Sequence, residues 1–523
     1  MSADLALMDG NILTMNASQP YAEAVAIKDG RILKVGTNDA ISPLIGENTK
    51  VIRLKGKTIV PGFIDAHIHV ADFGRLLGWL NLAAIASIEE LQLTLKRRVE
   101  STPKGRWIIG KGWDQTRFAE QRLPTRFDLD AVSPENPVIF YHRLGQMCVV
   151  NSKALELAGI TKQTTTPEDG IIDKDTVTGE LTGILQGTAM NLIWKAIPEP
   201  TEEELAEAAA LACREIVRAG ITSVHWIVLS AVELAVMQRL LAQNKLPMRV
   251  YMIIPAAFID RVADFKVNDD LSLRIGGVLI TVDGYLASKT AALFQPYNNG
   301  SGTSGDMLCT RDEIVTVASR ILKMNLQPVL HAMGDRAVDA ALTAIEQISA
   351  EPLRKLGRIR IEHAAVLNKE LIGRMKKLDV VVSVQPLVIA SEFSTWSALE
   401  NLGVERGRWL YPLKTLLENG IRVIGGSDCP MEPLNPLMGI QAAVLREVFP
   451  EENLTVEEAL RMYTVDAAYA AGEETLKGSI ETGKLADLTV LSHDPRRVHP
   501  TAIANIDVQM TIVGGKIIYS EIT

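Results

Sequence analysis

The stretch Thr58-Ile59-Val60-Pro61-Gly62-Phe63-Ile64-Asp65-Ala66-His67-Ile68-His69-Val70 is an apolar run that ends in two histidines separated by one residue. In a β-strand, side chains at positions i and i+2 project from the same face, so His67 and His69 present two imidazoles to one point in space. Such a run indicates a buried strand with the histidines at its carboxyl end, where barrel enzymes hold their chemistry. Two imidazoles make half of a site for a first-row metal ion, although a lone His-x-His also arises by chance in cores and on surfaces.

Seven further apolar, β-rich runs follow this one, and helical stretches separate them. Alternating strands and helices indicate a parallel sheet covered by helices, and eight strands are the number that a barrel of this kind needs. We therefore predict an α/β fold with a TIM-type (β/α)8 barrel over residues 59–471. The expected strands are residues 59–70, 221–228, 248–254, 274–283, 327–333, 358–367, 380–386 and 422–429.

The two ends of the chain and one long insertion fall outside this pattern. Asp29-Gly30 lies between alternating apolar residues, which is a strong hairpin signal, and residues 512–519 have the same texture. We expect residues 1–58 and 472–523 to build one small composite β-sandwich domain. About 150 residues separate the first two barrel strands, far too many for one crossover. Residues 72–200 are therefore expected to form an inserted cap subdomain.

The composition is that of an ordinary globular protein, with 47% apolar and 22% charged residues among 523. The net charge is -9 and no run of Lys or Arg is dense enough to follow a phosphate backbone, so nucleic acid is not an expected partner. No apolar segment reaches the roughly 18 residues that a membrane span needs, and the first 20 residues lack the pattern of a signal peptide. The four cysteines lie far apart, which argues against a disulfide framework. We expect a cytoplasmic protein that acts on a small molecule, and an exposed barrel flank is compatible with a homodimer.

Three more polar residues fall near the ends of later predicted strands. His331 lies in the fifth run, His363 in the sixth, and Asp428 near the end of the eighth. Each alone has an ordinary explanation, such as a buried histidine bonded to backbone or an aspartate that caps a helix. The carboxyl ends of barrel strands lie at the same end of the barrel, so these side chains are expected to meet His67 and His69. Five such groups at one end favour an active site.

Three imidazoles and one carboxylate suit a borderline cation such as Zn2+, although Fe2+ and Mn2+ accept the same donors. Such an ion lowers the pKa of a bound water to about 7, so hydroxide becomes available at neutral pH. A carboxylate beside the ion can take the proton of the water and later pass it to a leaving nitrogen. Asp428 is the candidate for that role.

Motifs along nearly the whole chain carry a family resemblance. They include Pro61 to His69, Gly112-Trp113-Asp114, Asn151-Ser152, Asp283-Gly284, His331-Ala332-Met333-Gly334-Asp335, Glu362-His363 and Ser427-Asp428. With these motifs the chain resembles the amidohydrolase superfamily, in particular its YtcJ-like branch of metal-dependent hydrolases, which includes N-substituted formamide deformylase. The resemblance implies hydrolysis, usually of a C–N bond, at a centre with one or two metal ions.

The resemblance also implies roles for the polar residues. The ligands in relatives with one metal ion match His67, His69, His331 and Asp428. His363 would then bond the water or the substrate, and ligation of the metal by His363 is the alternative. Many relatives with two ions carry a bridging carboxylated lysine four residues before the Asp-Gly of strand four, where this chain has Leu279. Leucine cannot ligate, so we favour one divalent ion. Two ions with an external bridging anion or water, and loss of activity, are the alternatives.

Substrate recognition is expected to differ from that of relatives. Gln146 stands where relatives often have histidine, and Gly187 stands where they often have glutamate. Both belong to the expected cap, which should cover the pocket. The candidate pocket residues are Gln146, Trp113, His225 and Asp283. Ordinary core packing, or support of a ligand from behind, is the competing interpretation for the aromatic residue and for His225.

These observations together predict a metal-dependent amidohydrolase that acts on a carbon–nitrogen bond other than a peptide bond. The expected substrate is a small amide with an apolar N-substituent, cleaved through metal-bound hydroxide, with Asp428 and His363 as catalytic residues. A metal-dependent deaminase of a ring or an amidine is the first alternative, and it would release ammonia. A catalytically inactive metal-binding homologue is the second.

Overall fold

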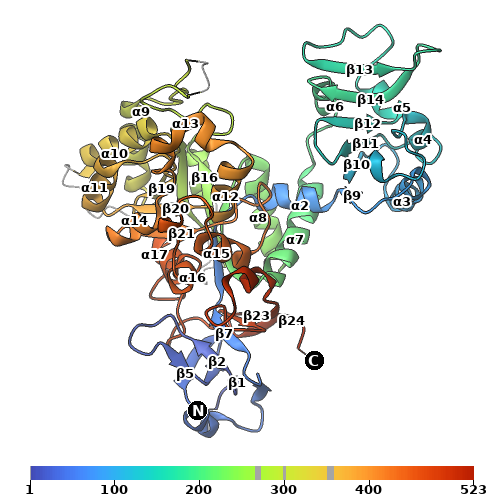
Figure 1. The fold of residues 1–523 in the computed structure, drawn as a ribbon. Helices are drawn as coiled ribbons and strands as arrows, with labels where there is room; N and C mark the ends of the chain where they lie inside the picture. The colour runs from blue at the N-terminus through green and yellow to red at the C-terminus, as the bar shows by residue number, and fades with distance from the viewer. Residues whose placement is uncertain (1, 265–271, 299–301, 350–357, 523) are drawn as a thin grey trace. The chain divides into compact units, whose positions relative to one another are not determined.

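The computed structural model describes residues 2–264, 272–298, 302–349 and 358–522, and the chain divides into two compact units (Figure 1). The first unit comprises Met1–Phe73 and Ala209–Thr523, and we call it the barrel unit. The second comprises Gly74–Ala208, and we call it the inserted unit. The sequence predicted an inserted subdomain over residues 72–200, which begins two residues earlier and ends eight residues earlier than this unit.

The barrel unit contains eight parallel strands in a nearly closed sheet, in the order β21-β20-β19-β18-β17-β16-β15-β8. The two edge strands are joined by a parallel bridge between Ile68 and Cys429. Each predicted run contributes one of these strands, so the TIM-type arrangement expected from the sequence is confirmed. The strands are β8 (Phe63–Ile68), β15 (Ile221–Ile227), β16 (Arg249–Pro255), β17 (Leu273–Thr281), β18 (Gln327–Ala332), β19 (Arg360–His363), β20 (Val381–Val384) and β21 (Arg422–Gly425).

Helices that surround the strands explain why the strand residues are buried throughout. All seven residues of β15 are buried, as expected for a parallel strand covered on both faces. The helices instead bury one stripe each. Figure 1 shows α9, α10 and α11 on the outside of the sheet. The main helices of this unit are α8 (Ala231–Ala242), α9 (Arg311–Lys323), α10 (Asp335–Ser349), α11 (Lys369–Leu378), α12 (Pro386–Ser394), α13 (Ala398–Gly407), α14 (Leu413–Glu418), α15 (Pro436–Val444), α16 (Val456–Met462) and α17 (Val465–Ala470). The chain passes from one unit to the other within α2 (Val70–Leu77) and again within α7 (Glu202–Arg218).

The stretch 58–70 forms two strands instead of the single barrel strand that we predicted. β7 (Thr58–Pro61) belongs to a terminal sheet, β8 belongs to the barrel, and Gly62 lies between them. A Cβ atom at Gly62 would lie 2.2 Å from the side chain of Thr222, so only glycine allows the chain to pass this close. The chain changes from one sheet to the other at this point.

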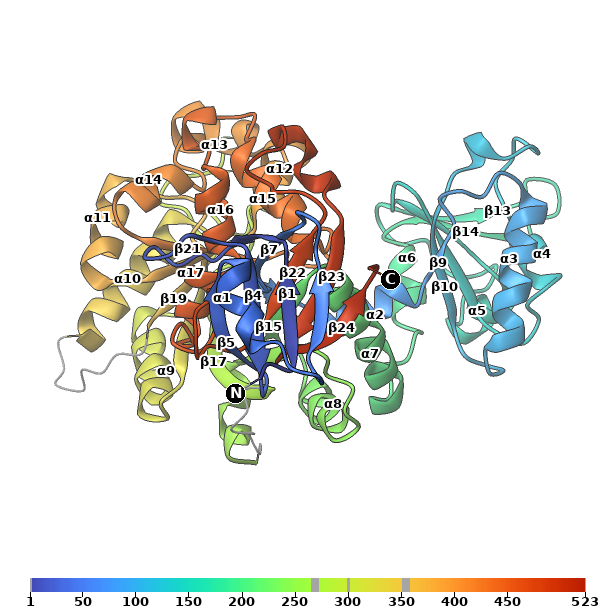
Figure 2. The same cartoon turned by 90° about the horizontal axis from the view of Figure 1, so that it is seen from below.

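Segments from both ends of the chain pair in the terminal sheets (Figure 2). β22 pairs antiparallel with β7, which itself pairs with β2, so residues near the C-terminus lie beside residues near the N-terminus. One apolar cluster contains Leu7, Ile12, Leu488 and Ile512. The first sheet contains β5 (Arg31–Gly36), β4 (Ala24–Lys28), β1 (Leu5–Met8) and β6 (Lys50–Arg53); the second contains β24 (Lys516–Ser520), β23 (Val508–Val513), β22 (Leu488–Leu491), β7, β2 (Asn11–Leu13) and β3 (Tyr21–Ala22).

The inserted unit has its own six-stranded sheet with apolar clusters on both faces. Along β11, Val138 and Phe140 belong to one cluster, whereas Ile139 and Tyr141 belong to the other, as the alternation of a strand requires. The sheet order is β13 (Gly170–Lys174), β14 (Leu181–Gly187), β12 (Met147–Val150), β11 (Val138–His142), β10 (Ile108–Trp113) and β9 (Leu80–Asn81). Its helices are α3 (Ile88–Ser101), α4 (Arg126–Asp130), α5 (Ser152–Leu157) and α6 (Met190–Trp194).

The sequence argued against a disulfide framework and against a membrane span. All four cysteines are free, and three of them are buried. Within the described segments, none of the helices combines the length and the apolar character needed to cross a membrane.

Candidate active site

The candidate active site lies where the barrel closes. The backbone N–H of Asp428 donates to the carbonyl of His67 at 2.8 Å, and the N–H of His69 donates to the carbonyl of Cys429 at 2.9 Å. These two hydrogen bonds join β8 to the segment that follows β21, and we call this junction the seam. Because they fix the relative position of the two segments, they bring a carboxylate from one end of the barrel sequence beside two histidines from the other.

A buried aspartate and a glycine make the seam possible. Oδ1 of Asp65 accepts hydrogen bonds from the backbone N–H of His67 at 3.1 Å and of Ser427 at 3.0 Å, so one carboxylate ties both sides together. Burial raises the pKa of Asp65 to about 6, and the hydrogen bonds from Ser427 and His67 work against that rise. A Cβ atom at Gly426 would lie 2.5 Å from the backbone nitrogen of His67. A larger residue there would push the two segments apart.

Two of the predicted site residues have left-handed backbone conformations. The φ angle is +56° at Asp428 and +66° at His363. Aspartate and histidine adopt this region more readily than most residues, but it is uncommon for any side chain larger than glycine. Such conformations gather at functional sites, where the surrounding structure holds them. The backbone at both residues is therefore held in a conformation that costs energy.

His67, His69 and Asp428 form one group that could hold a metal ion. Oδ1 of Asp428 lies 3.3 Å from Nε2 of His69 and 3.6 Å from Nε2 of His67. One ligand atom from each of the three residues lies within 4.8 Å of the others. Burial alone would raise the pKa of Asp428, but the hydrogen bond to His69 and the nearby histidines hold it below its ordinary value. Asp428 is thus a carboxylate at neutral pH.

His331 and His363 stand beside this group. The rings of His331 and His363 are 4.7 Å apart between centroids, and the ring of His363 is 5.4 Å from that of His67. Among the described residues, neither ring nitrogen of His331 nor Nδ1 of His363 makes a hydrogen bond, although all three atoms are buried. Oδ1 of Asp283 is near, at 3.8 Å from Nδ1 of His331. Burial, with the neighbouring histidines, lowers the pKa of His331 to about 3 and of His363 to about 4. Both imidazoles are therefore neutral, which is the form that binds metals.

Glu362 fixes the orientation of His67. Oε2 of Glu362 lies 2.6 Å from Nδ1 of His67, and Oε1 is paired with the guanidinium of Arg360. Burial would raise the pKa of Glu362, but Arg360 and His67 hold it well below its usual range. A carboxylate can only accept, so Nδ1 of His67 carries the proton and the lone pair of a neutral ring is on Nε2, which faces Asp428.

Two predicted pocket residues, His225 and Asp283, are fully buried and do not line an open surface. Nδ1 of His225 bonds the guanidinium of Arg360 at 2.8 Å. The carboxylate of Asp283 accepts backbone hydrogen bonds from Ala292, Met333 and Gly334 at 2.8 to 2.9 Å. Oδ1 of Asp283 also lies 3.8 Å from Nδ1 of His331, so this carboxylate joins three loop segments directly beside the candidate site. Nε2 of His225 is buried without a hydrogen bond among the described residues. A pocket role for either residue stays a prediction.

The other predicted pocket residues belong to the inserted unit. Trp113 is fully buried in a core cluster of that unit, where its indole N–H donates to the carbonyl of Phe140 at 2.9 Å, so it packs and is not exposed. Gln146 is exposed, and its carbonyl accepts from the N–H of Gly187 at 3.1 Å. The two departures from the family pattern are thus neighbours. A Cβ atom at Gly187, where φ is +56°, would lie 2.2 Å from the carbonyl oxygen of Asp169, which explains the glycine.

Leu279, at the position of the bridging lysine of relatives, packs against apolar side chains. Its neighbours in the sheet are Pro255 and Val329, neither of which can ligate a metal ion. Among the described residues of this apolar cluster, none carries an anionic group that could take the place of the carboxylated lysine.

Sequence reasoning assigned no role to several residues of this site. Tyr285 is exposed, and its ring lies 5.1 Å from that of His331 and 6.5 Å from that of His363. Its signal was its place two residues after Asp283, beyond the end of β17. The glutamate of Glu362-His363 had a signal too, since a carboxylate next to a strand-end histidine can reach its neighbour's ring across the barrel. Arg360 had no such signal, because no sequence pattern distinguishes a buried arginine from an exposed one.

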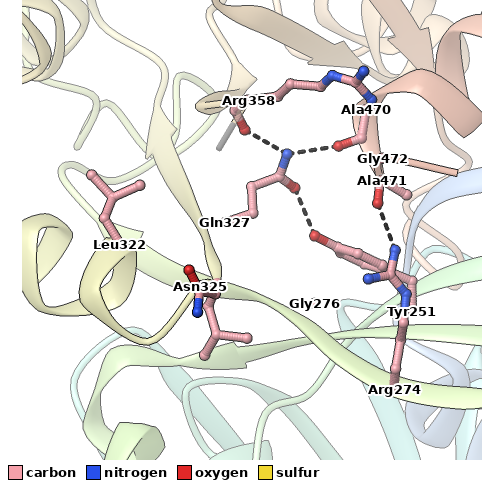
Figure 3. Close-up of a pocket in the computed structure, with 11 residues that line it drawn as sticks. Tyr251, Arg274, Gly276, Leu322, Asn325, Gln327, Arg358, Ala470, Ala471 and Gly472 are labelled. Carbon is pink, nitrogen blue, oxygen red and sulfur yellow. Dashed lines mark hydrogen bonds between the residues drawn. The ribbon is translucent and has the colours of Figure 1, made fainter. Parts of the chain in front are cut away.

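A separate cavity of about 390 Å³ lies at the opposite ends of the barrel strands (Figure 3). The side-chain amide of Gln327 donates to the carbonyls of Arg358 and Ala470 there and accepts from the hydroxyl of Tyr251. The two arginines that line it, Arg274 and Arg358, are paired with Glu473 and Glu474. Its charges are thus satisfied, and it lies at the end of the barrel that serves stability, not chemistry.

Comparisons with known proteins agree in family. The model of the amidohydrolase family matches residues 50–519. The YtcJ protein of Bacillus subtilis (strain 168) is 32% identical over 98% of this chain and 98% of its own length. N-substituted formamide deformylase of Arthrobacter pascens is 29% identical over 99% of this chain and 98% of its own. The crystal structure of an uncharacterized metal-dependent hydrolase from Pyrococcus furiosus matches with a TM-score of 0.77 and 32% identity, covering 94% of this chain and 100% of that chain.

Proposed function

Because this chain belongs to the amidohydrolase family, we propose that it hydrolyses the C–N bond of a small N-substituted amide with the help of one divalent metal ion. The family resemblance found in the sequence is confirmed, and the chain is a hydrolytic enzyme. The observation that carries the finer proposal is the convergence of His67, His69 and Asp428 at the seam. Amide hydrolysis adds water across the bond and yields a carboxylic acid and an amine.

The residues present fit a metal ion. Nε2 of His67 and Nε2 of His69 face one carboxylate oxygen, and the buried ring nitrogens of His331 make no hydrogen bond among the described residues. We propose His67, His69, Asp428 and His331 as its holders, with Zn2+ as the first choice and Fe2+ or Mn2+ as alternatives. When bound, such an ion polarises a carbonyl group and acidifies water. Leu279 supplies no bridge, which favours one ion over two.

Asp428 and His363 would perform the proton and hydrogen-bond chemistry. The lowered pKa of Asp428 arises because the bond to His69 and the nearby histidines outweigh burial, so its Oδ atoms are ready to accept a proton from the attacking water. The same carboxyl group can then deliver that proton to the leaving nitrogen. His363 is neutral and buried beside His67, so one of its ring nitrogens can bond the carbonyl oxygen of the substrate or the water.

An apolar N-substituent is supported by side chains near the ends of the barrel strands. Leu229 follows β15, Tyr285 and Phe294 follow β17, and Met431 follows β21, and all four are more than half exposed. Of these, Tyr285 lies at the candidate site, with its ring 5.1 Å from that of His331. Exposed apolar groups at a site commonly mark a place that binds an apolar partner. The relative from Arthrobacter pascens, named for its action on N-substituted formamides, supports the same substrate class.

Metal content and product identity test the proposal. Elemental analysis of metal-replete wild type should give close to one equivalent per chain, and His67→Ala should lose it. N-hexylformamide should yield hexylamine and formate with wild type. Asp428→Asn should lower kcat by roughly 10² to 10⁴, as expected for the loss of a general base, while the exposed control Asp507→Asn should not. Two equivalents of metal would contradict the single-ion site, and release of ammonia from amidines without any amide cleavage would indicate a deaminase.

A further inference from the structure

One face of α12 carries buried polar residues that the proposed chemistry does not use. α12 follows β20 at the carboxyl ends of the barrel strands. Gln385 is the N-cap of the helix, and Val388, Ile389 and Glu392 are spaced i, i+1 and i+4, which places these three on one side of it; all four are buried. Buried apolar residues are ordinary at this spacing. A buried amide at one end and a buried carboxyl group at the other are unusual.

Two buried polar groups at this place lack partners in the part of the chain that the structure describes. Oε2 of Glu392 and the hydroxyl of Tyr411 are buried without a hydrogen bond, whereas the side-chain amide of Gln385 interacts with His363. Glu392 is only 2% exposed, and no described Lys, Arg or His is paired with it. Buried polar groups are satisfied in the great majority of cases, and each exception needs an explanation. Two such side chains from neighbouring segments call for a shared explanation.

The three side chains lie next to the candidate active site. Burial is the dominant cause that lowers the pKa of His363, and a hydrogen bond from the side chain of Gln385 works against it, which places Gln385 beside that ring. The N–H of Tyr411 donates to the carbonyl of Ala365, two residues after His363, at 2.9 Å. Burial raises the pKa of Tyr411, and the nearby carboxylates of Glu392 and Asp428 raise it further. The polar groups thus extend from His363 toward Glu392.

The chemistry of the three groups selects a ligand. A buried carboxylate with no cation beside it complements an ammonium group, and the amide and phenol oxygens offer further acceptors for its N–H bonds. Burial raises the pKa of Glu392 to about 7, so the group can ionise at neutral pH when a cation arrives. An apolar ligand would leave Glu392 and Tyr411 unsatisfied, at a cost that a natural site avoids.

We propose that Glu392, with Gln385 and Tyr411, forms a subsite for a protonated amino group carried by the substrate. The inference rests on the proposed function, because it extends the substrate to an amide whose N-substituent is apolar near the scissile bond and ends in an amine. The exposed apolar side chains follow β15, β17 and β21, whereas the three subsite residues all lie between β20 and β21. One substrate can present a chain to the first and a charge to the second.

Binding of simple probes tests the subsite without any catalysis. Metal-loaded, full-length protein is titrated calorimetrically at pH 7.5 with hexylamine and with 1-hexanol. Wild type should bind the amine at least about tenfold more tightly than the alcohol, a difference of one order of magnitude in Kd. Glu392→Gln and Glu392→Leu should abolish that preference. Glu400→Gln, at an exposed glutamate of α13, should retain it. Equal binding of both probes by wild type, or a preference that survives Glu392→Leu, overturns the subsite.

Kinetics separate the subsite from the proposed function. kcat/KM is measured for N-hexylformamide and N-(6-aminohexyl)formamide. The amino compound should be preferred by about tenfold or more in wild type and not in Glu392→Gln. If the amine probe binds selectively but neither amide is cleaved, the subsite stands and amide hydrolysis fails. If both amides are cleaved with equal kcat/KM, hydrolysis stands and the subsite fails. Because Leu removes an unpartnered buried carboxyl group, Glu392→Leu should remain folded, and its thermal unfolding is recorded alongside.

Discussion

Nδ1 of His67 lies 2.6 Å from Oε2 of Glu362, and both side chains are almost completely buried. Arg360 pairs with the other carboxylate oxygen, so the glutamate remains ionised inside the barrel. The ionised carboxylate holds the proton of His67 on Nδ1 and directs Nε2 toward Asp428. A pair of residues from β8 and β19 thereby sets the orientation of one proposed metal ligand.

Glu362→Gln should weaken metal binding. The amide keeps the size of the side chain but not its charge, so the imidazole loses its partner as a firm acceptor and its basicity falls. Partners of this kind are worth roughly 10- to 100-fold in metal affinity. A competition titration with a chromophoric chelator measures the change, and circular dichroism confirms that the variant is folded. Glu370→Gln, at an exposed position of α11, is the matched control. Unchanged affinity in Glu362→Gln would contradict the orienting role.

Gly426→Ala should disturb the seam. The added Cβ would meet the backbone nitrogen of His67 at 2.5 Å, and overpacking of this kind costs about 1 to 3 kcal/mol. Because the seam also positions Asp428, metal affinity should fall in parallel. Gly373→Ala in α11 is the contrast, since a Cβ there meets nothing within 4 Å, and it should stabilise the protein by about 0.5 to 1 kcal/mol. Denaturant unfolding measures both, and equal effects of the two substitutions would refute the steric argument.

Asp283→Ala should act on stability more than on substrate binding. The substitution leaves the backbone N–H groups of Ala292, Met333 and Gly334 without their acceptor. Each unsatisfied buried donor costs about 1 to 3 kcal/mol, so the total loss should be at least about 3 kcal/mol. Asp283→Asn keeps one acceptor oxygen and should lie between wild type and Ala. Chemical denaturation gives the free energies of unfolding. A raised KM with undiminished stability would instead support the pocket role that the sequence suggested.

Glu392 should make stability depend on pH. Burial raises its pKa in the folded protein from 4.5 to about 7, so its contribution to stability is fully present below pH 4.5 and is lost as the pH rises through about 7. The loss amounts to about 3 kcal/mol. Without added ligand, Glu392→Leu should therefore gain stability relative to wild type as the pH rises from 5 to 8. Unfolding curves at four pH values measure the difference, with Glu400→Gln as the control. A difference that does not change with pH would mean that Glu392 ionises normally.

Much of the fold could be predicted because its signal is local. Each barrel strand is an apolar run of several residues followed by a helical stretch, and a parallel strand buried on both faces needs no partner to be recognised. The division of residues 58–70 was missed for the same reason. β7 and β8 are both apolar, and only the pairing of β7 with β22 shows that the chain has left one sheet for another.

The candidate site could be predicted in kind but not in arrangement. Histidines and an aspartate near strand ends predicted metal chemistry. Three of these residues, His67, His69 and Asp428, lie together in the structure. His225 and Asp283 also stand at strand ends, yet burial gives them structural partners. Position along a strand does not reveal whether a side chain faces solvent, a neighbour or an ion.

The sequence by itself determined the class of the barrel, the family, and the residue types available for metal chemistry, because periodicity and motifs are properties of short segments. Only the tertiary structure decided that Asp428 lies beside His67 across the seam, that Glu362 orients this histidine, and that Glu392 is buried without a partner. These three facts depend on the register between strands distant in sequence and on which surfaces exclude water. The strand register and the exclusion of water are both set by the packing of the whole barrel, so neither can be read from a single segment.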